Sequence, residues 1–516
     1  MAAEVKKKER LYTLDGLRGI SCCVIAFLWH YLNMQPYDQG MPFQTIFDLF
    51  YRFGQYFVEV FFVLSGFVMA YTYKEKIEKG LGLVEYMLKR YKHIWPLMIV
   101  TLIVTTLLQF SYYAMRGGYY VYKCDIFHFI LNILCLQSGW FDSGEQTFNG
   151  PAWCISVEIF CYLVFYIVVH SSKENKNKYY VLSLTLVLFS FFVLNRDFYY
   201  PVLNAFMARG IGSFFIGVLI KEMYENLDKT YYKKIYGAVA VFGAVLIFAA
   251  LLNQVKLSIG IGVQTIFMMF LSVAFILMSL TITPIKFILS TKFFVWLGKI
   301  SMDVYLWHIP AQLIIKNTDS YFNMNLNYGS RIVWIFYAFL VLGIATMSNR
   351  ALSKGIENKE GKIFSTTTLV LIAILSIGIR LTGPILIHPI DNNLTWNGQS
   401  QIVYPRHSSS EPFGVHEDLN DVELSFYTVT WNNEYPQGAR LSYSIIDDQN
   451  NIKIQGEYDL KIAQDGRVGT IALDGVLANG NYKVVFDVLD NNDTPFALMS
   501  NHDGTVALKV RGKKKK

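Results

Sequence analysis

The sequence is poor in charged residues for its length. Of 516 residues, 16% are charged and 53% are hydrophobic, with a mean hydropathy of +0.32, which excludes an ordinary soluble chain. The formal net charge is +7, but Lys and Arg fall in short clusters between apolar runs rather than along one polar face, so no nucleic-acid partner is expected. The lipid bilayer is the expected surrounding of most of the chain.

Cysteine is scarce and has no pattern typical of a metal site or a disulfide framework. The six cysteines are Cys22, Cys23, Cys124, Cys135, Cys154 and Cys161. Most lie in apolar stretches without the paired short spacings of metal sites, so they are expected to be small hydrophobic side chains, and no metal is expected. The C-terminal region lacks cysteine altogether and must fold on its hydrophobic core.

The N-terminus lacks the small-residue cleavage site of a signal peptide. The basic start MAAEVKKKER leads into an apolar run that many further runs follow, which predicts an uncleaved first helix. Runs long enough to cross a bilayer, about 20 residues each, predict eleven spans. They cover residues 14–34, 53–73, 93–112, 151–170, 178–195, 205–220, 233–252, 260–281, 294–315, 331–349 and 363–387.

Basic residues alternate between the connections, as the positive-inside rule requires of cytoplasmic loops. They are Lys6, Lys7, Lys8 and Arg10, then Lys74, Lys76, Lys79, Lys89, Arg90 and Lys92, then Lys173, Lys176 and Lys178, then Lys221, Lys229, Lys233 and Lys234, then Lys286 and Lys292, then Arg350, Lys354, Lys359 and Lys362. The N-terminus is therefore predicted to be cytoplasmic and, with eleven spans, the C-terminal region to be outside. Arg380 interrupts the last span, and if that span does not cross, the C-terminal region is cytoplasmic instead.

From about Asp391 the sequence becomes polar, with short alternating runs such as VELSFYTVTW, RLSYSII, GTIALDGVL, NYKVVFDVL and TVALKV. We therefore predict an all-α polytopic membrane bundle of 10 to 11 transmembrane helices in residues 1–355, an extra helix and linker in 356–390, and a small antiparallel β-sandwich in 391–516. The closing RGKKKK is expected to be a solvated tail. The β-domain lacks the Gly-Asp-Ser motif of an esterase. It is expected either to bind a glycan through Trp396, Trp431 or Tyr435, or to be a spacer that docks an envelope protein.

Four ionisable side chains are predicted at one depth, in the outer half of the membrane. They are His30, Glu59, Glu158 and His308. Such residues are costly inside a span and indicate function, and carboxylates that orient imidazoles are typical of a general-base site. The alternative is structural, with packing histidines that pair with the carboxylates.

Three cationic or titratable residues, Arg18, Arg90 and His93, are predicted at the cytoplasmic end instead. There they could bind an anionic ligand, or the arginines could be topological anchors only. Arg18 and His30 lie about 18 Å apart along a helix, a gap that a donor with a phosphate head and a long arm could bridge.

The same residues lie in five ordered motifs over about residues 11–350. These are LDGLRGI, FVEVFFVLSGF, KRYKHIWP, GPAWCISVEIFCYL and GKISMDVYLWH. In this order the chain resembles the bacterial acyltransferase family 3 of integral membrane O-acyltransferases.

The resemblance implies an acyl-CoA donor, usually acetyl-CoA, bound from the cytoplasm as a substrate, with no permanently bound cofactor. It also implies a carbohydrate hydroxyl as acceptor and a bacterial plasma-membrane location. His30 corresponds to the family's essential base, Arg18 and Arg90 to its donor contacts, and Glu158 to a site carboxylate.

The chain departs from the family pattern at several places. Eleven residues separate Arg18 from His30 where the family usually has ten, which turns the His by about 100° on a regular helix unless a local bulge restores the register. His93 stands in place of a second Arg, and Glu59 in place of the more frequent Asp. The β-domain stands where many members carry an esterase-like domain. A transporter or flippase for a glycan or lipid-linked substrate is the rival interpretation, because buried charges also line substrate pathways.

Overall fold

The structure is a computed structural model of the whole chain. It describes residues 10–34, 40–116, 119–121, 124–141, 146–173, 175–196, 198, 200–225, 230–252, 260–322, 324, 326–353, 358–382, 385–391, 402–431, 433, 435–463, 467–473, 475–489, 493–501 and 504–514. Six residues with predicted topological or binding roles lie outside the described residues, namely Lys6, Lys7, Lys8, Lys229, Lys354 and Trp396.

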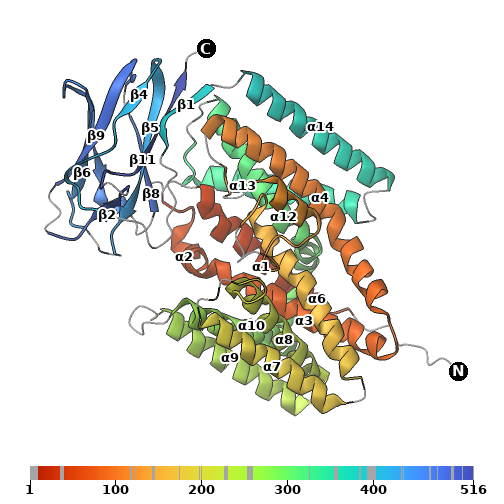
Figure 1. Ribbon diagram of the computed structural model, residues 1–516. Coiled ribbons are helices and arrows are strands. Elements are labelled where there is room, and N and C mark those ends of the chain that lie inside the picture. The colour runs from red at the N-terminus through yellow and green to blue at the C-terminus, as the bar shows by residue number, and fades with distance from the viewer. Residues whose placement is uncertain are drawn as a thin grey trace. The chain divides into compact units, whose positions relative to one another are not determined.

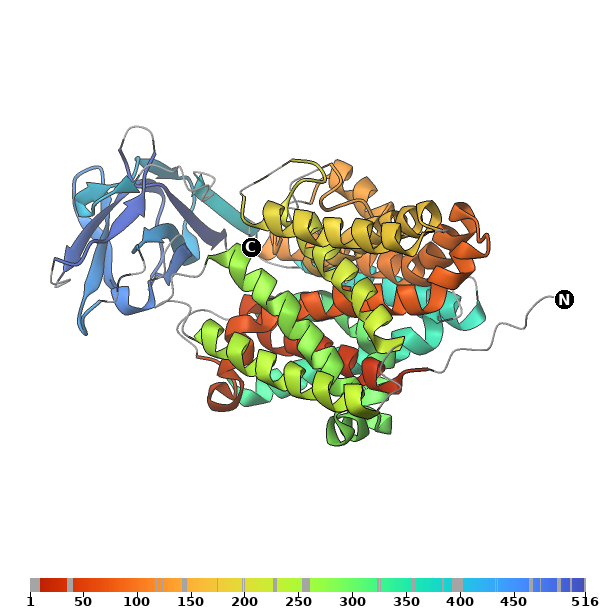
Figure 2. The same cartoon turned by 90° about the horizontal axis from the view of Figure 1, so that it is seen from below.

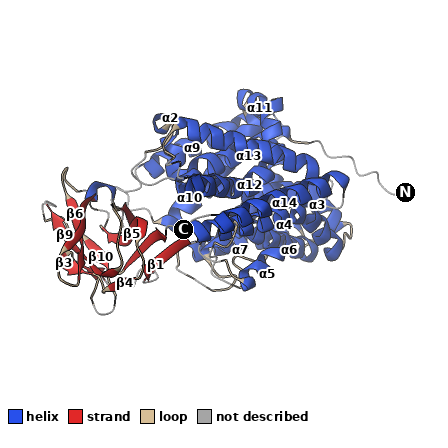
Figure 3. Cartoon of the chain, turned by 90° about the horizontal axis from the view of Figure 1, so that it is seen from above, coloured by secondary structure: helices blue, strands red, loops and turns tan. Residues whose placement is uncertain are grey.

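Helices form the first part of the described chain and strands the last part (Figure 3). The helices are α1 (Tyr12–Cys23), η1 (Val24–Trp29), η2 (His30–Met34), α2 (Gln44–Phe53), η3 (Gly54–Tyr56), α3 (Phe57–Glu78), α4 (Leu83–Arg116), α5 (Ile126–Ile133), η4 (Gly150–Ala152), α6 (Trp153–Ser171), α7 (Lys176–Leu194), α8 (Ala205–Glu225), α9 (Thr230–Leu252), α10 (Ile261–Thr281), α11 (Thr283–Leu289), α12 (Lys292–Phe322), α13 (Arg331–Leu352) and α14 (Lys359–Thr382). The first predicted span coincides with α1, η1 and η2 together, and each of the other ten coincides with one α-helix, apart from shifts at the ends.

Eight helical segments among the described residues are long and apolar enough to cross a membrane. They cover Tyr12–Met34, Gln44–Glu78, Leu83–Met115, Gly150–Ser171, Lys176–Leu194, Gly262–Thr281, Arg331–Leu352 and Lys359–Thr382. The other three predicted spans are α8, α9 and α12. Charged residues interrupt α8 and α12, and in α9 the described apolar stretch is Lys234–Ala249.

Close helix packing depends on small residues at two crossings. A Cβ atom on Gly66 of α3 would lie 1.8 Å from the Phe214 carbonyl oxygen of α8, and one on Gly217 would lie 1.9 Å from the Val63 carbonyl oxygen. Likewise, a Cβ atom on Gly298 of α12 would lie 2.0 Å from the Asp15 carbonyl oxygen of α1. Packing between spans relies on such close backbone approach, so these glycines fix α3 against α8 and α1 against α12. Figure 1 shows α8 among its neighbours α3, α7 and α10.

The first span is not a regular helix. Between Arg18 and His30 it changes from α-helix to the π-helical segment η1, and at His30 to the 3₁₀ segment η2. Three carbonyls of this irregular stretch accept hydrogen bonds from other helices. The Tyr337 hydroxyl donates to the Ala26 carbonyl, the Trp334 indole to that of Phe27, and the Gln312 amide to that of His30. These side chains satisfy backbone groups that irregular helix leaves free.

The strands form two antiparallel sheets that face one another (Figure 2). They are β1 (Ile385–Asp391), β2 (Ile402–Val403), β3 (Arg406–Ser409), β4 (Phe413–Val415), β5 (Leu419–Val429), β6 (Arg440–Asp447), β7 (Ile452–Asp459), β8 (Arg467–Ala472), β9 (Gly480–Leu489), β10 (Ala497–Met499) and β11 (Leu508–Lys514). One sheet has the order β1-β11-β5-β10-β2 with β8 beside β5, and the other has β3-β9-β6-β7 with β4 beside β9.

One hydrophobic core joins both sheets, as in a β-sandwich. Leu424 and Phe426 of β5 contribute from one sheet, and Leu441 and Ile445 of β6 from the other. The predicted sandwich is therefore confirmed, although its first strand begins at Ile385, within the segment assigned to the extra helix and linker. Tyr435 belongs to this core and is not a surface binding residue.

The prediction of a solvated C-terminal tail is wrong for residues 511–514. These residues continue β11, which pairs with β1 and β5. Acidic residues on and beside β5 explain the difference, because they neutralise the basic strand. Arg511 Nε donates to Glu423 Oε2 at 2.8 Å, and Lys513 and Lys514 pair with Asp421 and Glu417.

Candidate active site

A cavity of about 260 Å³ opens within the helical bundle, lined by residues of α1, α3, α4, α6, α12 and α13. Four of the seven predicted site residues line it, namely Arg18, Arg90, His93 and Glu158. The other three, His30, Glu59 and His308, do not. The structure therefore separates the four predicted site residues that line the cavity from the three that do not.

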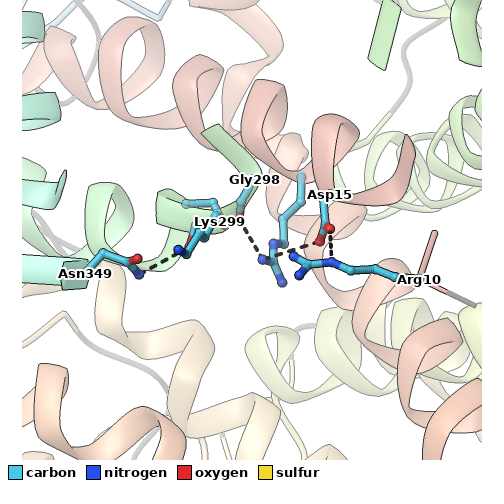
Figure 4. Close-up of polar contacts among 7 residues, drawn as sticks. Arg10, Asp15, Gly298, Lys299 and Asn349 are labelled. Atoms are coloured by element: carbon cyan, nitrogen blue, oxygen red, sulfur yellow. Dashed lines mark hydrogen bonds and ion pairs between the residues drawn. The ribbon is translucent and has the colours of Figure 1, made fainter. Parts of the chain in front are cut away.

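Arg18 enters the cavity from α1, where the helix touches α12. Its Nη2 atom donates to the Gly298 carbonyl oxygen at 2.6 Å, while Asp15 lies 3.9 Å away and pairs mainly with Arg10. Figure 4 shows Asp15 beside Arg10, and Asn349 reaching the backbone of Lys299. Arg18 Nε is buried and has no hydrogen-bond partner in the described part of the chain. Arg18 thus carries an unpaired N–H donor and lines the cavity.

Arg90 enters from α4 and is positioned by α3. Its guanidinium carbon lies 4.5 Å from the centre of the Tyr73 ring, and Nη2 donates to the Tyr73 hydroxyl. Arg90 Nε, like that of Arg18, is buried without a partner among the described residues. His93, one turn further along α4, lines the same cavity.

The three carboxylates that line the cavity are engaged by donors of the protein. Asp15 pairs with Arg10, Asp303 accepts from the Asn349 amide at 2.9 Å, and Glu158 accepts from Ser65 and Tyr162 at 2.5 and 2.6 Å. Each acid therefore has a local partner, whereas both arginines keep an unpaired Nε. This imbalance favours an anionic group as the occupant.

His30 and His308 meet, although they are 278 residues apart. His30 Nδ1 lies 2.8 Å from His308 Nε2, and the rings stack with centroids 4.9 Å apart. The π-helical segment explains how His30 reaches this position. A π turn takes in one residue more than an α turn, so it absorbs the extra residue between Arg18 and His30 and its rotation of about 100°. The local bulge predicted from the sequence is present.

The two predicted carboxylates do not join the imidazoles. No hydrogen bond in the described chain connects Glu59 or Glu158 to either His, so the predicted cluster of four is not formed. A common depth in the membrane, as predicted from the sequence, does not fix which way each helix turns its side chain.

Glu59 instead forms a buried ion pair with Arg209 of α8, which the sequence interpretation missed. Arg209 Nε donates to Glu59 Oε1 at 2.5 Å and Nη2 to Oε2 at 3.1 Å, while the guanidinium lies 5.3 Å from the centre of the Trp153 ring. The available signal was an Arg inside an apolar run, which needs an acidic partner.

Tyr305 connects the cavity with the histidine pair. It lines the cavity, and its ring centroid lies 5.8 Å from that of His308, one turn further along α12. Pro310 in the same helix cannot donate to the Leu306 carbonyl, and the Asn149 side chain donates there instead at 2.9 Å. This replacement keeps the Tyr305–His308 turn of α12 intact.

Comparison with known proteins gives a family match over the helical part of the chain. The model of the family described as "Acyltransferase domain", acyltransferase family 3, matches residues 11–350, which contain every residue of the cavity and the histidine pair. The acyltransferase MdmB of Streptomyces mycarofaciens is 28% identical over 162 residues, which are 30% of this chain and 38% of that protein. The chain thus spans well under half the length of this relative. No solved structure matches the chain.

Proposed function

Because this chain belongs to acyltransferase family 3 and is a membrane acyltransferase, we propose that it transfers an acyl group, usually acetyl, from cytoplasmic acyl-CoA to a hydroxyl group of a cell-surface or exported glycan. The observation that carries the proposal is a cavity with two unpaired guanidinium donors next to a pair of hydrogen-bonded imidazoles. We place the protein in a bacterial plasma membrane with the N-terminus in the cytoplasm, on the alternation of basic connections.

The cavity suits the narrow part of the donor. Its volume of about 260 Å³ is below the roughly 300–1,000 Å³ of pockets that enclose a whole drug-sized ligand. We therefore expect it to hold the acyl-pantetheine arm, with the nucleotide outside. Arg18 and Arg90 would donate to phosphate oxygens, and Glu158 would accept from an amide N–H of the arm.

His30 is assigned as the general base. When His30 Nδ1 donates to His308 Nε2, the lone pair of His30 Nε2 is left to accept a proton, and His308 fixes this tautomer as the third group of a triad does. His30 would take the proton of the acceptor hydroxyl as its oxygen attacks the thioester carbon. The imidazolium would then return that proton to the departing CoA thiolate.

The experiment that tests the function compares the envelope glycans of a deletion strain with those of its parent by mass spectrometry. We expect one O-acyl group to disappear in the deletion strain, to return with the intact gene, and to stay absent with the His30→Ala gene. In vesicles, release of CoA thiol should depend on a hydroxyl acceptor. Glycan export that fails without any change in acylation, and without thiol release, would support a transporter or flippase instead.

A further inference from the structure

Tyr305 lines the cavity and its ring contacts the ring of His308. The residue is 5% exposed. Its ring faces Phe61 at 5.9 Å on one side and His308 at 5.8 Å on the other. Neither imidazole lines the cavity, so we expect a thioester whose arm fills the cavity to approach His30 past Tyr305.

The Tyr305 hydroxyl is a buried donor without a proper acceptor. Among the described residues its one polar partner is the Cys154 thiol, a weak acceptor, and no hydrogen bond of normal geometry reaches it. Buried polar groups in native proteins are nearly always hydrogen-bonded, so an exception calls for an explanation.

Other buried tyrosines of the bundle show the usual arrangement. Tyr31, Tyr51, Tyr86 and Tyr337 each donate to a backbone carbonyl, at 2.8, 3.0, 3.2 and 2.9 Å. The bundle thus supplies a backbone acceptor to these four hydroxyls and, within the described residues, none to Tyr305, at the wall of the cavity where we expect the donor. A ligand oxygen is the acceptor that fits this position.

We propose that the Tyr305 hydroxyl donates a hydrogen bond to the carbonyl oxygen of the acyl group while that oxygen becomes an oxyanion. This inference rests on the proposed function. The acceptor oxygen forms a bond to the carbonyl carbon, its proton goes to His30, and the C=O π electrons move to the oxygen that Tyr305 holds. When the C=O bond re-forms, the C–S bond breaks, and the thiolate takes the proton back from His30. Tyr305 keeps its own proton throughout.

The test compares Tyr305→Phe with Tyr51→Phe in the full-length protein. Tyr51 is the matched control because it is equally buried, lies in α2, and its hydroxyl donates to the Pro42 carbonyl. Loss of one oxyanion donor usually lowers kcat by about 10² to 10³-fold, and we expect that for Tyr305→Phe, with KM and direct binding of acyl-CoA within about threefold of wild type.

The two variants should rank in the opposite order in stability, with Tyr305→Phe the more stable and Tyr51→Phe the less stable. Removing an unpaired buried hydroxyl should leave the unfolding midpoint of Tyr305→Phe unchanged or higher, whereas Tyr51→Phe loses a hydrogen bond and should unfold earlier with normal kcat. A normal kcat for Tyr305→Phe, or a loss confined to acyl-CoA binding, would overturn the inference alone. Absence of acyl transfer by the wild-type protein would overturn the proposed function and this inference with it.

Discussion

At the scale of single residues, the cavity arginines and the histidine pair carry separable tasks. Replacing His30 by Ala removes the base but no cavity contact, so kcat should collapse while acyl-CoA still binds. Replacing Arg90 by Ala should weaken acyl-CoA binding by about 1.5–3 kcal/mol, as for the loss of a hydrogen bond to a charged group. Isothermal calorimetry with a nonreactive acyl-CoA analogue, together with steady-state kinetics, separates the two effects.

Arg90→Lys is the control for charge alone. It should recover only part of the affinity, because Lys cannot stack on Tyr73 and donate from a planar fork at once. If His30→Ala turns over normally, the base is another group, and His308 is the next candidate.

Glu59 and Arg209 are expected to stabilise the fold rather than to act on substrate. Removing one partner of a buried ion pair leaves an uncompensated charge, and we expect Glu59→Ala and Arg209→Ala each to lower the unfolding free energy by about 3–5 kcal/mol. The double variant should lose less than the sum of the single losses, because the pair is coupled. Thermal unfolding in detergent measures this. Additive losses, or a fall in kcat without any loss of stability, would contradict it.

Sequence reasoning found residues such as His30 and His308 because ionisable side chains are conspicuous in apolar runs. It could not assign their contacts, since the partner of a side chain depends on the rotation of each helix and on crossings far apart in the chain. Glu59 shows this limit, because its hydrogen-bond donor was sought among the histidines while the donor, Arg209, lies on α8. Sequence reasoning does not single out Tyr305, because an aromatic residue in a span carries no sign that its hydroxyl lacks a strong acceptor.

At the scale of elements, the π-helical segment η1 sets the position of His30. Deleting Ala26 should convert η1 to regular α-helix and keep His30 on its present side, because ten residues would then separate it from Arg18. Inserting one Ala after Ala26 should turn His30 about 100° further from His308. We expect measurable turnover from the deletion and a loss of more than about 100-fold from the insertion. An Ala insertion in the exposed turn at Gly80 is the control, and greater harm from the deletion than from the insertion would contradict this role of η1.

Elements with a strong hydrophobic pattern in the sequence were predicted, and short elements with a weak hydrophobic pattern were not. Long apolar runs placed the helices, and alternating runs placed β5, β6, β8, β9 and β11. The short strands β2, β3, β4 and β10 span only two to four residues, too few for an alternating pattern to be detected. Their position is fixed by pairing with longer strands, which is a tertiary effect. Strand β11 was predicted too short because its lysines are typical of a solvated tail. The strand continues because acidic side chains on and beside the neighbouring strand offset these charges.

At the scale of the whole molecule, everything assigned to the chemistry precedes residue 350. The residues that line the cavity run from Leu14 to Asn349, and the histidine pair lies between them in the sequence. The family match ends at the same point. Among the described residues, α14 and the sandwich therefore contribute no lining to this cavity, and their proposed task concerns the acceptor or an envelope partner.

Ending the chain after Ser353 should therefore leave acyl-CoA binding within about threefold of the full-length protein. The affinity comes from Arg18 and Arg90, whose positioning contacts with Gly298 and Tyr73 are all retained. Calorimetry on the truncated protein, with full-length Arg90→Ala as the control that loses binding, makes the comparison, and a sharp thermal transition shows that the truncated chain is folded. Acylation of the natural glycan should fall more than donor binding if the sandwich presents the acceptor. A folded truncation that no longer binds acyl-CoA would show that residues after 353 complete the donor site, and the site would have to be redrawn to include them.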